Sequence, residues 1–424
     1  MKEYKYRIAD QLLQRKLQGK GAVLVQGPKW CGKTTTAQQQ AASVLDLGDT
    51  AVLENSQQML QILPGKLLEG GTPRLIDEWQ TLPQLWDMVR SEVDRRGEMG
   101  QFILTGSSVP VDEDQRRHSG NGRFAWVDMR PMSLWESGES SGEVSLQDLF
   151  DGKELQPVEC GLGIERLAFL LCRGGWPQAT FLDGELALDQ ARDYYETIYK
   201  VDIHRVDKVR RSSERTRLLL RSYARNTGSA VSFSKMSADI RDNDNASISY
   251  ETISDYVDAL KKLFVLEDMP AWNPNLRSKA AIQSSHTRYF TDPSIATAAL
   301  SIGPGDLLAD LPTFGLMFEG MAVRDLRTYA DALGGEVFHF RDASGLECDA
   351  VLHRRDGSYA LIEIKLGGRD NIDKGAATLL ELSARIDTDR MHAPSLLMVL
   401  TATGDYAYRR PDGIYVVPIG CLRP

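Results

Sequence analysis

The chain has 424 residues, of which 42% are hydrophobic, and it carries a formal net charge of −9. This length suits about two or three domains with real cores, and no apolar run approaches the roughly 20 residues of a membrane span. The acidic balance argues against a protein that coats nucleic acid electrostatically, although it leaves room for a local basic face. Five scattered cysteines without metal-ligand spacing, and an N-terminus without an apolar leader, favour a cytoplasmic protein.

The first elements predicted along the chain are an amphipathic helix over 7–18, a buried strand over 22–26 and a helix over 37–44. The loop after the strand fits G-x-x-x-x-G-K-[ST], whose backbone N–H groups surround phosphate oxygens. Lys33 is expected on the β- and γ-phosphates, and Thr34 in the shell of a Mg²⁺ ion. A chance match in a glycine turn is the alternative. The residues predicted to bind the nucleotide are Gly27, Pro28, Lys29, Trp30, Cys31, Gly32, Lys33, Thr34 and Thr35.

An acidic strand is the second feature that a nucleotide hydrolase needs. After a predicted strand over 50–54 and a break over 64–71, residues 73–80 form an apolar run that ends in two acids. Asp77 is placed to hold Mg²⁺, directly or through water, and Glu78 to orient and deprotonate the attacking water. The alternative is an ordinary strand that runs into a solvated turn.

A helix over 87–96 and another buried strand over 101–108 follow. We expect this strand beside the acidic one, with the hydroxyls of Thr105 and Ser107 sensing the γ-phosphate or the water. A Gly-Ser turn explains the same residues equally well.

A basic loop over 116–123 then leads into a predicted strand over 124–129. Arg123, at the end of this loop, is a candidate to reach the γ-phosphate in the same or in a neighbouring subunit. A surface arginine without a catalytic role is the alternative.

Taken together, the segments GPKWCGKTTT, LIDEWQ, FILTGSS and HSGNGRF-AWVDMRPMSLWESG resemble a widespread prokaryotic AAA-type ATPase family. Its members pair the ATPase with a C-terminal domain of poorly defined function, and the resemblance covers nearly the whole chain. It implies that Lys33 and Thr34 contact phosphate and Mg²⁺. It also implies that Asp77 and Glu78 are the acidic pair and that Ser107 or Thr105 is the sensor.

The middle of the chain begins with a Ser-, Gly- and acid-rich stretch, residues 136–151, which we interpret as a loop or domain junction. Helices are predicted over 161–172 and 186–201, and the Gly-Gly-Trp-Pro turn at 174–177 suits a structural role or a hinge. The charged residues over 202–207 either face the ATP site or form a solvated helix end, and we favour the second.

Residues 213–270 give the order helix, short helix, turn, helix, strand, which is that of a winged helix-turn-helix. A DNA-binding role would place residues 247–252 at the major groove. However, the helix carries Glu251, Asp255 and Asp258, which would repel phosphate, so packing or protein contact is favoured. Basic residues that leave room for contacts with a nucleic-acid backbone are Arg277, Lys279 and Arg288.

The last predicted module has a helix over 313–326, strands over 336–341, 346–352 and 359–365, a helix over 378–386, and strands over 395–401 and 413–418. Glu363 and Lys365 point to one face of their strand, and a hairpin would bring Asp349 beside Glu363. This is the D…E-x-K constellation of restriction-like nucleases, in which the acids hold Mg²⁺ and the lysine helps to activate water. Glu319 is a further candidate ligand. A retained fold without cleavage is the alternative.

The predicted fold class is therefore α/β. It comprises a P-loop AAA-type ATPase domain (1–135), a helical region with a winged-helix-like segment (136–300) and a restriction-endonuclease-like domain (301–424). The predicted function is that of an ATP- and Mg²⁺-dependent conformational switch or motor, cytoplasmic and not membrane-bound, able to oligomerise. Its partner would be DNA, RNA or a protein. The alternatives are an ATP-gated Mg²⁺-dependent nuclease and a non-catalytic nucleotide-sensing scaffold.

Overall fold

The computed structural model describes residues 4–107, 122–207, 209–275, 283 and 285–424. Its contacts divide the chain into two compact units, whereas the sequence suggested three consecutive domains. The first unit comprises Met1–Pro131, Ile198–Ser212 and Tyr256–Val265, and the second comprises Met132–Thr197, Ser213–Asp255 and Leu266–Pro424. Two short segments from the middle of the chain therefore belong with the N-terminal part.

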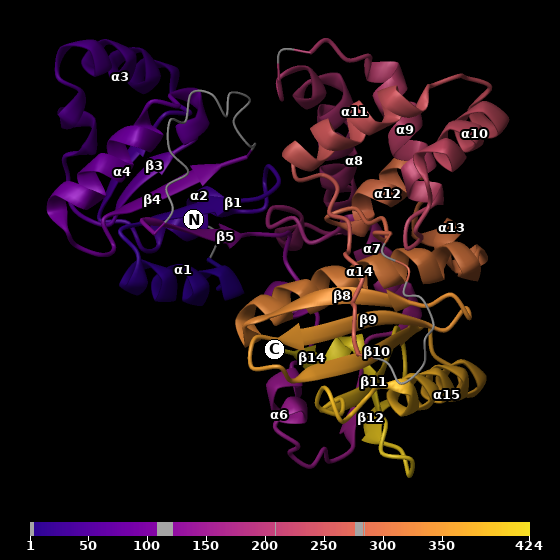
Figure 1. Ribbon diagram of the computed structural model, residues 1–424. Helices are drawn as coiled ribbons and strands as arrows, with labels where there is room; N and C mark the ends of the chain where they lie inside the picture. Colours follow the sequence, from indigo (N-terminus) through magenta and orange to yellow (C-terminus); the bar gives the residue numbers. More distant parts are fainter. Residues whose placement is uncertain (1–3, 108–121, 208, 276–282, 284) are drawn as a thin grey trace. The chain divides into compact units, whose positions relative to one another are not determined.

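The first unit is built on a parallel five-stranded sheet in the order β2-β3-β4-β1-β5 (Figure 1). Strand β4 pairs with both β1 and β3, which confirms that the third predicted strand lies beside the acidic one. Because all five strands run in the same direction, their carboxyl ends meet at one edge of the sheet. The strands are β1 (Ala22–Gln26), β2 (Ser43–Asp46), β3 (Arg74–Asp77), β4 (Phe102–Gly106) and β5 (Phe124–Asp128).

Helices cover this sheet and bury its apolar strands. Helices α1 and α2 pack on β1, and α4 packs on it as well. Beside α4 the ring of Trp86 stacks on Phe124 with centroids 4.1 Å apart, and Trp79 lies 5.1 Å from Trp86. These rings belong to the core cluster that also buries Ala22 and Leu24 of β1. The helices are α1 (Ile8–Gly19), α2 (Lys33–Gln38), α3 (Thr50–Ile62) and α4 (Leu85–Arg96), with the short 3-10 helices η1 (Pro64–Leu68) and η2 (Trp79–Thr81).

Two sequence predictions in this unit are wrong. The helix expected over 37–44 ends at Gln38, and the second strand is β2. The stretch 50–54, expected as a strand, is the first part of α3. The cause is local: the Asp49 carboxylate accepts hydrogen bonds from the N–H groups of Ala51 and Val52 and so caps the helix.

The second unit contains a mixed seven-stranded sheet in the order β7-β12-β13-β11-β10-β9-β8. Helix α14 packs on β8, β9 and β10, and α15 packs on β9, β10 and β11 (Figure 1). The predicted order of this module, a helix, three strands, a helix and a strand, is confirmed. The sheet strands are β7 (Val158–Glu159), β8 (Gly335–Arg341), β9 (Glu347–Arg354), β10 (Tyr359–Lys365), β11 (Leu396–Thr401), β12 (Tyr406–Arg409) and β13 (Tyr415–Pro418).

A second, smaller pairing closes the same unit. Strand β14 (Leu422–Arg423) at the end of the chain runs parallel to β6 (Val144–Ser145). The stretch 136–151, expected as a loop, therefore contains β6 and two short helices. The helices of the unit are α5 (Leu134–Ser137), α6 (Leu146–Phe150), α7 (Ile164–Arg173), α9 (Ser213–Arg225), α10 (Phe233–Asp244), α12 (Pro293–Leu300), α13 (Pro304–Ala309), α14 (Leu311–Leu333) and α15 (Arg369–Arg385). Helices α8 (Gly184–Lys200) and α11 (Tyr250–Lys262) cross from one unit to the other along the chain.

The helical segment predicted as winged helix-turn-helix is only partly formed. The three helices α9, α10 and α11 occur in the expected order, but residues 264–270 are not a strand. They make isolated antiparallel bridges, Leu266 with Phe290 and Met269 with Thr287. Phe264 has a φ of 57°, so the chain turns sharply where the strand was expected to start. The candidate basic residues Arg277 and Lys279 lie outside the described residues.

Over the described part of the chain, the helices are too short or too polar to cross a lipid bilayer.

Candidate functional site

The loop between β1 and α2 has the backbone of a phosphate-binding loop. Gly27 and Gly32 have φ angles of 151° and 100°, a region that side chains with a Cβ avoid. A Cβ at Gly27 would also lie 2.0 Å from the carbonyl oxygen of Met129, so glycine is required there. Lys33 is buried, and its ammonium donates to the Pro28 carbonyl oxygen at 2.7 Å. The lysine predicted to bind phosphate thus lies folded across its own loop.

The two predicted acids lie beside this loop at the carboxyl edge of the sheet. Asp77 is the last residue of β3, and its carboxylate accepts hydrogen bonds from the hydroxyls of Thr34, at 3.0 Å, and Thr105. Glu78 follows it and accepts from the Ser107 hydroxyl at 3.3 Å. The ends of β3 and β4 and the start of α2 therefore bring together the residues that the sequence assigned to metal, base and sensor.

These side chains fit a nucleotide-bound Mg²⁺ ion. Mg²⁺ is held in proteins by one or two carboxylates together with waters and substrate phosphates. The Thr34 hydroxyl and the Asp77 carboxylate, already in contact, supply such oxygen ligands next to the loop. The described residues contain no cluster of three or more His, Cys, Asp or Glu side chains arranged for a metal, so ligands from a phosphate would be needed to complete the site.

Sequence reasoning missed the side chains that support the loop from outside. The guanidinium of Arg7, just before α1, is buried and donates to the carbonyl oxygens of Cys31 at 2.8 Å and Arg130 at 2.7 Å. The Lys29 ammonium lies 2.6 Å from the Asp202 carboxylate. Asp202 belongs to the charged stretch that we interpreted as a solvated helix end, and this interpretation is wrong because the carboxylate is buried against the loop. Nothing in the local sequence pattern signals either contact.

Arg123 does not reach the nucleotide loop of its own chain. It precedes β5, and its carbonyl oxygen accepts from the N–H of Ala22, the first residue of β1. The loop follows the other end of β1, five residues away, which is about 16 Å along a strand. The Arg123 guanidinium instead pairs with Asp94 of α4 at 2.8 Å. The prediction for the same subunit is wrong, and the rest of the basic loop, residues 116–121, lies outside the described residues.

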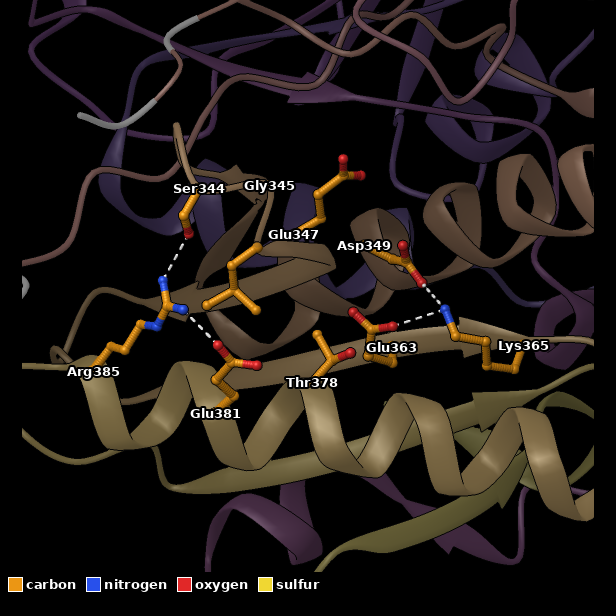
Figure 2. Close-up of a pocket in the computed structure, with 10 residues that line it drawn as sticks. Ser344, Gly345, Glu347, Asp349, Glu363, Lys365, Thr378, Glu381 and Arg385 are labelled. Carbon is orange, nitrogen blue, oxygen red and sulfur yellow. Dashed lines mark hydrogen bonds and ion pairs between the residues drawn. The ribbon is translucent and has the colours of Figure 1, made fainter. Parts of the chain in front are cut away.

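A second group of polar side chains lies on the sheet of the other unit. Strands β9 and β10 are antiparallel neighbours, as the predicted hairpin required. The Lys365 ammonium bridges two carboxylates, at 2.9 Å from Asp349 and 2.7 Å from Glu363, and Asp349 also accepts from the N–H of Ile364 (Figure 2). The predicted D…E-x-K arrangement is thus present in space.

These three side chains line one end of an open polar groove of about 470 Å³. At the other end of the groove Arg385, from α15, donates to Ser344 and pairs with Glu381 (Figure 2). The lining carries four carboxylates and two cations, so the groove is acidic overall. The ionisable residues in the lining are Glu347, Asp349, Glu363, Lys365, Glu381 and Arg385.

Glu319 of α14 is part of the same electrostatic group. Burial, followed by the charge of Asp349, raises the pKa of Glu319 to about 8, and Tyr289 donates a hydrogen bond to it. Burial and Asp349 also raise the pKa of Glu363 to about 7. Without a bound cation Glu319 therefore carries a proton at neutral pH. The cluster has one firmly ionised carboxylate fewer than the sequence suggested.

Comparison with known proteins matches three parts of the chain to family models. Residues 19–137 match a model described as an AAA domain. Residues 164–306 match Domain of unknown function (DUF8612), and residues 314–422 match Domain of unknown function (DUF4143).

Two curated relatives are Uncharacterized protein Mb2031c of Mycobacterium bovis and Uncharacterized protein Rv2008c of Mycobacterium tuberculosis. Each is 22% identical over 415 residues, which is 97% of this chain and 83% of the relative. Among solved structures, the Walker-type ATPase PABY2304 of Pyrococcus abyssi is 15% identical with a TM-score of 0.41, covering 69% of this chain and 94% of its own. The Aeropyrum pernix ORC1 protein in complex with DNA is 11% identical with a TM-score of 0.28, covering 73% and 95%.

The matched AAA model spans the phosphate loop, the acidic strand β3 and the intervening strand β4. The sheet order and the contact between Thr34 and Asp77 agree with it. Residues 19–137 of the chain therefore form an AAA-type ATPase domain.

Proposed function

We propose that the protein hydrolyses ATP at the loop between β1 and α2 and uses the cycle as a conformational switch or motor acting on nucleic acid or a protein partner. The observation that carries the proposal is the contact of Asp77 with Thr34 and Thr105, with Glu78 and Ser107 adjacent. Two acids and three hydroxyls converge beside a glycine loop that is closed by its own lysine.

Each residue has a distinct task in this proposal. Lys33 would exchange the Pro28 carbonyl for phosphate oxygens, and the glycine loop would donate its N–H groups to them. Thr34 and Asp77 would hold Mg²⁺, which neutralises phosphate charge when bound. Glu78 would accept a proton from the attacking water, and Ser107, which already donates to Glu78, would keep that carboxylate oriented.

The test is Glu78→Gln, which keeps the shape of the side chain but removes the base. We expect ATP turnover to fall by about 10²- to 10⁴-fold, while the affinity for ATP is kept. Glu54→Gln, on the exposed face of α3, is the matched control and should turn over ATP like the wild type. Unchanged turnover in Glu78→Gln would remove Glu78 from the mechanism. Binding without turnover in the wild type would instead favour the nucleotide-sensing scaffold.

A second activity, cleavage of nucleic acid by a Mg²⁺-dependent nuclease site, is favoured by one observation. Asp349, Glu363 and Lys365 meet on neighbouring strands at the end of an open groove. In a restriction-like nuclease the two carboxylates would hold the cation, and the lysine would stabilise charge on the reacting phosphate. The helix-strand-strand-strand-helix-strand order of this module supports the same assignment.

Lys365→Met tests this second activity. Mg²⁺-dependent cleavage of DNA or RNA, assayed with and without ATP, should be lost in this variant and kept in Lys374→Met, which changes an exposed lysine of α15. Cleavage that survives in Lys365→Met would assign the activity elsewhere or to a contaminant. A dependence of cleavage on ATP would identify the nuclease as ATP-gated.

A further inference from the structure

The phosphate loop carries two lysines with different partners. Lys33 contacts a loop carbonyl, whereas Lys29 forms an ion pair with Asp202, whose carboxylate oxygen lies 2.6 Å from the ammonium. The Lys29 side chain is 37% exposed, but that of Asp202 is only 4% exposed. Within the described part of the chain, Lys29 is the only cation in ion-pair distance of Asp202. A buried carboxylate thus depends on one mobile lysine of the nucleotide site.

We propose that Lys29 and Asp202 form a latch that senses bound triphosphate. Lys29 would leave Asp202 for a phosphate oxygen when ATP enters the loop, and Asp202 would lose its counterion. This inference rests on the proposed ATP site and adds to it a regulatory contact that the sequence motifs do not contain.

Charge and burial give the latch its direction. A triphosphate carries several negative charges, whereas Asp202 offers one, and the flexible four-carbon stem of a lysine allows its ammonium to change partners. A carboxylate left buried without its cation is costly, so the segment that carries it must move until water reaches the carboxylate. Triphosphate binding would therefore loosen the segment Ile198–Ser212, which contains Asp202.

The covalent path of this segment explains where the signal would go. Its first residue follows Thr197 and its last precedes Ser213, both of which belong to the second unit. Inside the first unit its far end is fixed: Arg211 pairs with Asp207 at 2.6 Å, and the Ser212 N–H donates to the Tyr256 hydroxyl at 2.7 Å. Release of Asp202 would free the near end, next to α8, and so change the restraint on the chain that enters the second unit.

A double-mutant cycle tests the latch through binding of Mg²⁺–ATP or a non-hydrolysable analogue at equilibrium. Asp202→Asn removes the competing charge, so triphosphate affinity should rise by about tenfold, as expected for the loss of one half-exposed ion pair. In the Lys29→Met background the same Asp202→Asn change should have no effect, because no lysine is left to release. An equal effect in both backgrounds, or none in either, would overturn the latch.

Hydrogen exchange gives a second readout that does not depend on affinity. Adding the analogue to the wild type should speed exchange in residues 198–212, and in Lys29→Met, at a saturating concentration, it should not. Lys66→Met is the matched control, because Lys66 is an exposed lysine in η1, next to the start of β3 at the opposite edge of the sheet. It should respond like the wild type. Slower or unchanged exchange in the wild type with bound analogue would refute the latch alone, whereas no binding by any variant would refute the proposed ATP site as well.

Discussion

Two residues of the nucleotide site that are not glycine have left-handed backbones. The φ angles of Trp30 and Glu78 are 64° and 53°. A residue with a Cβ pays about 1–2 kcal/mol for this conformation, and such strain persists where the surroundings hold it in place. Glu78 is held by its contacts with Ser107 and Gln80 and by the 3-10 turn that follows it. The strain turns the carboxylate toward the end of β4, where the proposed attacking water would be oriented.

This strain predicts an unusual order of stabilities. Glu78→Gly and Glu78→Ala both remove the carboxylate, so both should lose turnover. Glycine is normally the less stable of the two in regular structure, but here Glu78→Gly should be the more stable by about 1 kcal/mol, because only alanine keeps the strain. Urea unfolding of the two variants measures the difference. A more stable alanine variant would show that residue 78 is not strained in solution.

The thiols of the second unit provide a chemical test of its packing. Cys160 is half-buried, and a hydrogen bond from the Cys421 thiol, first among several causes, lowers its pKa to about 6. Because the thiolate is the form that reacts, alkylation of Cys160 by iodoacetamide should rise through pH 6 and be nearly constant above pH 7. Cys421→Ser keeps a donor and should preserve this profile, whereas Cys421→Ala should move its midpoint toward pH 9. A midpoint near pH 9 in the wild type would contradict the contact.

At the scale of elements, the sequence was most informative where the signal is local. The strand, glycine loop and helix of the nucleotide site follow one another within a few residues, and the acids directly follow a buried strand, so both could be placed without the fold. Strand 50–54 was wrong because the Asp49 cap outweighs the β-propensity of Val52. Strands β7, β12 and β14 could not be predicted, since strands of two to four residues exist only through partners far along the chain.

The same limit applies to the sites. The convergence of Asp349, Glu363 and Lys365 was predictable because a hairpin and the two-residue period of a strand determine it. The pairing of Lys29 with Asp202 was not, because 173 residues separate the partners and neither lies in a periodic pattern.

The parallel sheet also makes a prediction for Arg123. Its pairing with Asp94 lies at the amino edge of the sheet, so Arg123→Ala should leave ATP binding unchanged and lower stability only slightly, as is usual for exposed ion pairs. Isothermal titration with nucleotide and urea unfolding measure the two effects. If turnover nevertheless falls strongly while the fold is intact, Arg123 must act on the nucleotide of a neighbouring subunit, which is the remaining form of the original prediction.

At the scale of the whole molecule, the second unit is not a consecutive C-terminal domain. Its main sheet takes β7 from residues 158–159 and its other strands from residues 335–418, and β14 at the end of the chain pairs with β6. Side chains reinforce this closure: the hydroxyl of Ser140 donates to the carbonyl oxygen of Leu422 at 2.7 Å. A module that begins at residue 301 would lack both β6 and β7, so the stretch 132–160 is part of the fold that carries the candidate nuclease site.

The end of the chain therefore has a larger effect on stability than its exposed position in the sequence suggests. Leu422 is fully buried, so Leu422→Ala should lower the unfolding free energy of the second unit by about 2–5 kcal/mol. Leu311→Ala, at a half-exposed leucine that begins α14, should cost less than about 0.5 kcal/mol. Hydrogen exchange of β6 and β13 separates the second unit from the first, because a global average would mix the two. Equal, small effects of the two substitutions would mean that residues 422–424 are not part of the folded unit, and that the pairing of β14 with β6 does not form in solution.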